Sequence, residues 1–108
     1  WKGTSEAATR YVETFEKRYG YAPVGYSDTL PYDALTVLLT AIRNAGRLDV
    51  ESVIATLEKG AFAGVAGTYR FDRSHQAIWG TGSSDLHGTV IRWEKDGARI
   101  VFPGSSPQ

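Results

Sequence analysis

The sequence predicts an α/β chain in which about three helices precede antiparallel β hairpins. Three helical stretches come first, and each stops at a glycine: Gly20, Gly46 and Gly60. After Gly60 the pattern changes to short β-prone runs that are separated by glycines. An Asp96-Gly97 pair lies between two of these runs and predicts a tight hairpin turn.

The first predicted helix begins after Ser5, whose side chain suits an N-cap, and ends before Gly20. Its apolar residues follow one helical stripe: Ala8, Tyr11, Val12, Phe15 and Tyr19. We expect the three aromatic residues of this stripe to pack in the core rather than to form a platform for a sugar. The opposite face is charged and is expected to face solvent.

A loop is predicted from Tyr21 to Thr29, before the second helix. Asp28 or Thr29 is expected to cap this helix, because Pro31 suits a first helical turn, where its missing N–H is not needed. The helix is apolar on more than one face: Leu35, Val37, Leu38, Leu39, Ala41, Ile42 and Ala45. This pattern predicts burial on two sides.

The third predicted helix begins after Asp49, which is a second N-cap candidate. Its inward residues are expected to be Val50, Val53, Ile54 and Leu57.

Beyond Gly60, the run Thr68–Phe71 alternates in the manner of a strand, and Gln76–Trp79 is expected to pair back onto it. Two further runs flank the Asp96-Gly97 turn: Thr89–Trp93 and Arg99–Phe102. Residues 103–108 are predicted to be a frayed tail.

The composition excludes several classes of function. Lys+Arg and Asp+Glu each number 12, so the formal net charge is zero, which argues against nucleic acid as a partner. The chain has no Cys, which excludes thiol catalysis, disulfides and Cys-based metal sites. No apolar run is long enough to span a bilayer. The chain contains no Met, even at its start, so we expect a processed or truncated polypeptide.

No motif in the sequence predicts an enzyme, a metal site or a cofactor. His75 and His87 lack further ligands at short spacing and are predicted to be surface residues. Ser83-Ser84-Asp85 lies near His87, but the Gly-x-Ser-x-Gly of a nucleophile elbow is missing. Gly80-Thr81-Gly82 is not followed by the Gly-Lys-Ser/Thr of a phosphate loop, so it is predicted to be a turn.

The order of these signals resembles the C-terminal part of the periplasmic solute-binding proteins of ABC transporters, most closely the branched-chain amino-acid or amide type. The run from Tyr19 to Gly60 carries the resemblance together with its Tyr32-Asp33-Ala34 motif. Phe62–Asp72 is similar to the family's "F.G..G...FD" ribbon, and Trp93 precedes a similar closing hairpin. The resemblance implies that residues 1–108 are one C-terminal fragment of a two-lobed protein with the type I periplasmic-binding fold.

In this family two α/β lobes close on a small ligand, usually an amino acid or short amide, and the closed form docks on a membrane permease. The resemblance therefore implies the binding component of an ABC importer, located in the periplasm or otherwise outside the cytoplasm, without enzymatic activity. Two alternatives stay open: a ligand-sensing module of the same fold in a regulator, and an unrelated small α+β dimerisation domain. A lone fragment would expose apolar faces and strand edges, so self-association is expected.

The resemblance places the candidate ligand-binding residues around the start of the second helix: Tyr26, Ser27, Asp28 and Tyr32. Tyr26 offers a ring and a hydroxyl, and Ser27 and Asp28 can reach a ligand ammonium or carboxylate. Structural roles are the alternative: Tyr26 can pack on the lobe, and capping alone explains an Asp at position 28. Tyr32 and Asp33 are expected mainly to pack and to start the helix.

Overall fold

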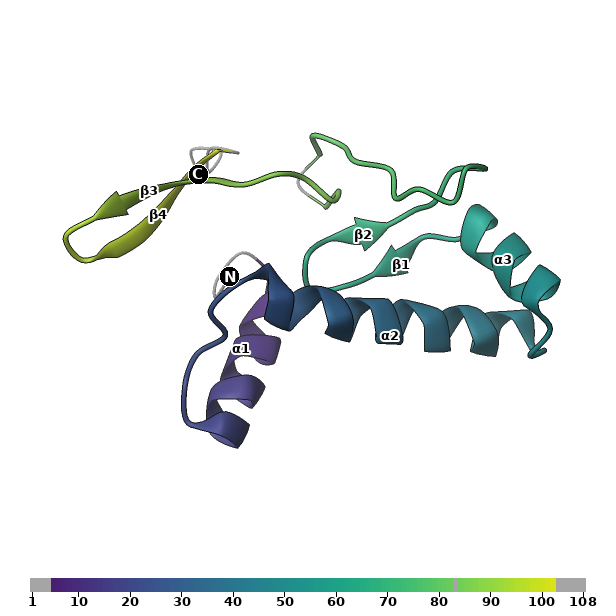
Figure 1. Cartoon of the computed structure of the whole chain (residues 1–108), viewed down its shortest axis with the longest axis horizontal. Helices are drawn as coiled ribbons and strands as arrows, with labels where there is room; N and C mark the ends of the chain where they lie inside the picture. The colour runs from purple at the N-terminus through teal and green to yellow at the C-terminus, as the bar shows by residue number, and fades with distance from the viewer. Residues whose placement is uncertain (1–4, 83, 103–108) are drawn as a thin grey trace.

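In the computed structural model, the described part of the chain forms three helices followed by two separate strand pairs (Figure 1). The structure describes residues 5–82 and 84–102, so the predicted tail of residues 103–108 lies outside the described residues. The elements are α1 (Glu6–Tyr19), α2 (Tyr26–Ala45), α3 (Val50–Lys59), β1 (Phe62–Ala63), β2 (Thr68–Tyr69), β3 (Val90–Glu94) and β4 (Gly97–Phe102). This order confirms the prediction of three helices followed by antiparallel strand pairs.

Local caps set both ends of α1 as predicted. The hydroxyl oxygen of Ser5 accepts a hydrogen bond from the Ala8 N–H at 3.0 Å. Gly20 adopts the left-handed conformation, with φ of 79°, and its N–H donates to the carbonyl of Glu16. Only Ala8 and Val12 of this helix are buried, so its aromatic residues lie at the margin of the fold.

The start of α2 differs from the prediction. The helix begins at Tyr26 with Gly25 as its N-cap residue, so neither Asp28 nor Thr29 occupies the N-cap position. Asp28 acts from inside the first turn, where its carboxylate accepts hydrogen bonds from the backbone N–H groups of Val24 at 2.8 Å and Gly25 at 3.4 Å. The Asp28 side chain therefore caps the helix from the third helical position. The sequence alone did not distinguish this position from the N-cap position.

Because α2 begins earlier than predicted, Pro31 lies inside the helix rather than in its first turn. Proline has no N–H, so the carbonyl of Ser27 cannot receive the usual intrahelical hydrogen bond from position 31. At its other end the helix stops as predicted at Gly46, which has a φ of 66°.

The third helix also follows its predicted caps. The carboxylate of Asp49 accepts a hydrogen bond from the Ser52 N–H at 3.0 Å, and the helix ends before Gly60. Val53 is buried, whereas Val50 is 70% exposed and is not the core residue that we predicted. Helical side chains lean toward the N-terminus, so the first residue of α3 points past the end of the helix.

The strands of the described residues form two antiparallel pairs, and isolated bridges lie outside them. Phe62 pairs with Tyr69 across β1 and β2, and the predicted strand through Phe71 continues only as a single bridge to Ala77. The hairpin of β3 and β4 turns at Asp96-Gly97 as predicted, with φ of 129° at Gly97. All residues of this hairpin are exposed, and Figure 1 shows it extending away from the helices.

The core lies where α2, α3 and β1 meet. Its buried apolar members are Val37, Ala41, Val53 and Phe62. On α2 the buried residues recur every four positions: Thr29, Asp33, Val37 and Ala41. Leu35 and Leu39 on the other side are 58% and 57% exposed, so within this chain α2 is buried on one side and not on two. Among the described residues, no helix is long and apolar enough to cross a membrane.

Candidate functional site

The four candidate ligand-binding residues all lie in the first two turns of α2. Tyr26 is 72% exposed and Tyr32 is 52% exposed, Ser27 is exposed, and Asp28 is half-buried. Each helical residue advances by about 100°, so Tyr26 and Tyr32 point about 120° apart around the helix axis. The structure thus brings the four residues to one end of one helix but does not direct them all to one face.

Tyr26, the first residue of α2, lies on the same face of the helix as its buried residues. It lies seven residues before Asp33, so the two side chains leave the helix in nearly the same direction and about 10 Å apart along the axis. Asp33 is covered by the turn between β1 and β2, whereas Tyr26 is largely open to solvent. An exposed ring that continues a buried stripe is suited to be covered by a ligand or by another part of a protein.

Asp28 has a defined structural task. Its carboxylate accepts the two backbone hydrogen bonds that close the start of α2, and its own carbonyl accepts a hydrogen bond from the Tyr11 hydroxyl. Burial, followed by the nearby charges of Asp28 and Asp33, raises the pKa of Tyr11 above its ordinary value. The hydroxyl therefore stays protonated as the donor that ties α1 to the first turn of α2.

Tyr32 belongs to an aromatic cluster on the surface, formed by Tyr11, Phe15, Tyr19, Tyr21 and Tyr32. The ring centroids of Tyr11 and Tyr32 lie 5.0 Å apart, and those of Phe15 and Tyr19 lie 4.6 Å apart. Tyr19 and Tyr21 are 52% and 58% exposed. The prediction that the α1 stripe forms core was therefore wrong for Tyr19, which contacts Phe15 and Tyr21 at the surface and not in the core.

Asp33 is a residue that the sequence predicts mainly to pack and to start the helix. Its side chain is fully buried, and its two carboxylate oxygens accept three hydrogen bonds: from the Val65 N–H at 2.7 Å, the Ala66 N–H at 2.9 Å and the Tyr69 hydroxyl at 2.9 Å. Burial and this hydrogen bond raise the pKa of Tyr69 well above its ordinary value. We call these four residues the Asp33 network. They confirm a packing role for Asp33, although it lies in the second turn and not at the helix start.

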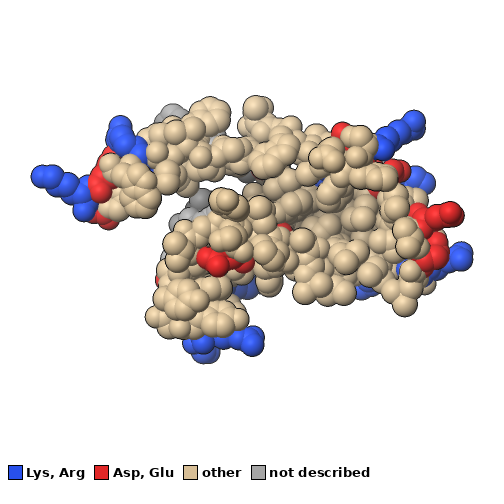
Figure 2. Space-filling view, in the orientation of Figure 1, with Lys and Arg blue, Asp and Glu red and all other residues tan. Residues whose placement is uncertain are grey.

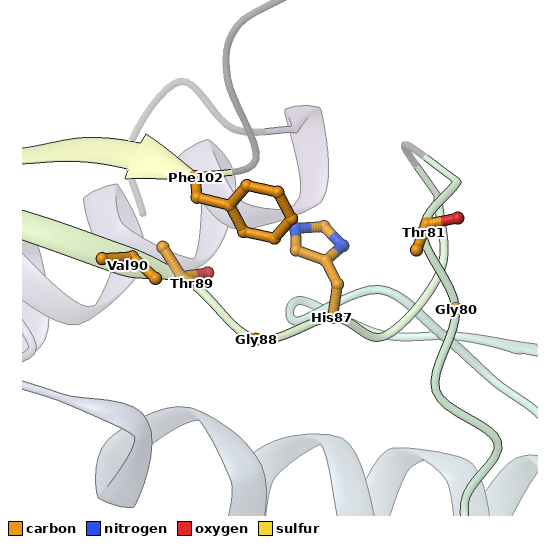
Figure 3. A pocket seen from close by; sticks show the side chains of 7 residues that line it. All are labelled: Gly80, Thr81, His87, Gly88, Thr89, Val90 and Phe102. Carbon is orange, nitrogen blue, oxygen red and sulfur yellow. The ribbon is translucent and has the colours of Figure 1, made fainter.

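A separate hollow of about 280 Å³ lies between the hairpin and the loop that holds Gly80 (Figure 3). Figure 3 shows the His87 ring between Phe102 and Thr81. The Nδ1 atom of His87 lies 2.8 Å from the Asp85 carbonyl, which only accepts hydrogen bonds, so Nδ1 carries the proton. The described residues contain no group of three side chains able to hold a metal ion.

Charge is dispersed over the molecule. Figure 2 shows Lys and Arg at several separate edges of the visible face, with Asp and Glu often beside them. Opposite charges also pair: Arg10 and Glu6 lie 2.6 Å apart, and Arg47 and Asp49 lie 2.8 Å apart. Among the described residues, the visible face therefore presents no single basic patch of the kind that binds nucleic acid.

The family model described as "Periplasmic binding protein" matches residues 1–98 of the chain. The chain belongs to the periplasmic binding protein family. Comparison with curated proteins finds no match.

Among solved structures, this periplasmic binding protein is similar to the leucine-binding protein LivK of Thermotoga maritima. The two share 27% sequence identity with a TM-score of 0.67, over 92% of this chain and 27% of that chain. The chain therefore spans about a quarter of the length of this solved relative. The match confirms the predicted type I periplasmic-binding fold, and this leucine-binding relative is of the branched-chain amino-acid type that the sequence resembles.

Proposed function

We propose that this chain is the C-terminal fragment of the substrate-binding component of an ABC importer. In the two-lobed protein it would help to capture an amino acid of the branched-chain type, or a short amide, outside the cytoplasm. The loaded protein would then deliver this ligand to a membrane permease, without catalysing a reaction. The observation that carries the proposal is the match of nearly the whole chain to one quarter of a leucine-binding protein.

Tyr26 and Ser27 are the residues that we propose for direct ligand contact. Both are exposed at the N-terminal end of α2, where a ring and a hydroxyl would be available to an aliphatic side chain and to a ligand carboxylate or ammonium. Asp28 would act mainly by shaping this end of the helix, since its carboxylate is bonded to the backbone. Tyr32 would support the site through its contact with Tyr11.

A chimera tests this function directly. Residues 1–98 would replace the matching segment of the Thermotoga maritima leucine-binding protein, and calorimetry would measure its binding of leucine, valine and a short aliphatic amide. We expect a folded chimera to bind one of these ligands. Tyr26→Ala should weaken binding by about tenfold, or ~1.4 kcal/mol, through loss of ring contact. The control Tyr19→Ala removes an equally large exposed ring from the end of α1 and should leave affinity unchanged.

The chimera also has a clear negative outcome. If circular dichroism shows native-like folding and calorimetry detects none of the three ligands, the proposed ligand class is wrong. If Tyr26→Ala and Tyr19→Ala behave alike, ligand binding does not use the N-terminal end of α2.

A further inference from the structure

The two halves of α2 are held in different ways. The apolar core cluster includes α2 from Val37 onward, with Ala41 buried and Ile42 and Ala45 partly buried beside it. The half that precedes Val37 carries Tyr26 and Ser27. It contacts α1 through Tyr11, and it contacts the turn between β1 and β2 through the Asp33 network. The candidate site is thus on the half of α2 that lies outside the apolar core.

Part of the surface between α2 and the strands is hollowed. A hollow of about 330 Å³ is lined by Leu30, Ala34 and Leu38 on α2 and by Tyr69 and Phe71. Apolar contacts are non-directional, so those that line the hollow do not by themselves define one helix position. Three directed hydrogen bonds to a single buried carboxylate do define one, because both their lengths and their angles are restricted.

Gly64 shows how closely the turn approaches Asp33. A Cβ atom at this position would lie 2.7 Å from the carboxylate of Asp33 and 2.6 Å from the ring of Tyr69. The glycine therefore allows the backbone N–H groups of Val65 and Ala66 to reach the carboxylate. The close approach fixes both the axial position and the rotation of α2 at Asp33.

We propose that Asp33 is a positioning residue for the candidate ligand site. This inference rests on the function proposed above, which makes Tyr26 and Ser27 ligand contacts. Tyr26 leaves α2 in nearly the same direction as Asp33, two turns earlier. A rotation or shift of the helix at Asp33 therefore moves Tyr26 and Ser27 by a similar amount. The Asp33 network sets where these two side chains lie relative to the turn between β1 and β2.

A distance measurement tests the proposal without any ligand. The chain has no cysteine, so Ser27→Cys and Ala63→Cys introduce two unique sites for spin labels on exposed residues of α2 and β1. Double electron–electron resonance on labelled chain diluted into an excess of unlabelled chain then reports the distribution of distances between them within one molecule. We expect Asp33→Asn to broaden this distribution and displace its mean, since an amide nitrogen cannot accept the hydrogen bonds of the carboxylate.

Val37→Ala is the matched control. It removes buried contact from the same face of α2 one turn later, so it lowers stability while leaving the Asp33 network intact. Its distance distribution should remain that of the parent chain. This comparison separates positioning from a general loss of stability.

Two results would overturn the proposal: a parent-like distribution in folded Asp33→Asn, or equal broadening in Val37→Ala. If circular dichroism shows that Asp33→Asn does not fold, Tyr69→Phe decides, because it removes one of the three hydrogen bonds and keeps the ring. We expect a smaller broadening in this variant, and an unchanged distribution would refute the proposal. Because no ligand takes part, failure of the chimera to bind leucine would not alter these results.

Discussion

The carboxylate of Asp33 and the hydroxyl of Tyr69 lie 2.9 Å apart and join α2 to β2 across 36 positions of sequence. The carboxylate is fully buried, yet the side chains of the described residues include no buried polar atom without a partner. A buried carboxylate with three donors is stable, whereas the same donors without it would lose their hydrogen bonds to both protein and water.

Removal of the Asp33 carboxylate should therefore be costly. Asp33→Ala leaves two backbone N–H groups and one hydroxyl unpaired, and we expect it to lower the free energy of unfolding by about 2–4 kcal/mol. Urea denaturation measures this change. The control Asp96→Asn lies in an exposed turn that also accepts Asn-Gly, so its stability should stay within about 0.5 kcal/mol of the parent. Equal losses in the two variants would refute the role given to the network.

Stability should fall at alkaline pH in a way that depends on Tyr69. The pKa of this residue is raised in the folded chain from an ordinary value of 10.0, so the folded state binds more protons than the unfolded state above about pH 10. The contribution of Tyr69 is fully present below that pH and is lost as pH rises. Urea unfolding between pH 9 and 11 should show a shallower decline for Tyr69→Phe. Identical slopes in both proteins would contradict this assignment.

Gly64 and Gly88 should respond differently to the same substitution. Gly64→Ala places a methyl group within 3 Å of Asp33 and Tyr69, and we expect a loss of about 1–3 kcal/mol. Around Gly88 a Cβ would meet nothing within 4 Å, so Gly88→Ala should change stability by less than about 0.5 kcal/mol. Thermal unfolding of the two variants provides the comparison, and a neutral Gly64→Ala would show that the turn is more adaptable than its geometry indicates.

The isolated chain should self-associate through its exposed apolar surface. Leu35 and Leu39 are each more than half exposed on α2, and Trp93 on β3 is 77% exposed. Sedimentation over a range of concentrations should show oligomers, and the double variant Leu35→Glu/Leu39→Glu should reduce them. Leu48→Glu, at an 82% exposed position between α2 and α3, is the control and should have little effect. A parent chain that stays monomeric at high concentration would count against this expectation.

The 108-residue chain alone should not bind leucine with a dissociation constant tighter than about 1 mM. It aligns with only 27% of the leucine-binding protein, so most of a closed two-lobed site would be missing. Calorimetry with leucine on the isolated chain provides the measurement. Tighter binding would show that this segment carries a sufficient site by itself.

Local signals in the sequence determined much of the secondary structure. Ser5 and Asp49 cap their helices because a side-chain oxygen three residues before a free N–H is enough to do so. Gly20 at the predicted helix end and Gly97 in the predicted hairpin turn take positive φ values, because glycine has no Cβ to oppose that conformation. The order of these signals also indicated the family, which the family model and LivK confirm.

Tertiary structure decided which polar residues do which task. The Tyr11 hydroxyl on α1 donates a hydrogen bond to the Asp28 carbonyl in the first turn of α2, across 17 positions of sequence. The partners of Asp33 lie 32, 33 and 36 positions away, and no helical or strand period connects residues so far apart. Sequence determined that an Asp stands there, and only the folded chain determined that its carboxylate is buried, because burial depends on the turn that covers it.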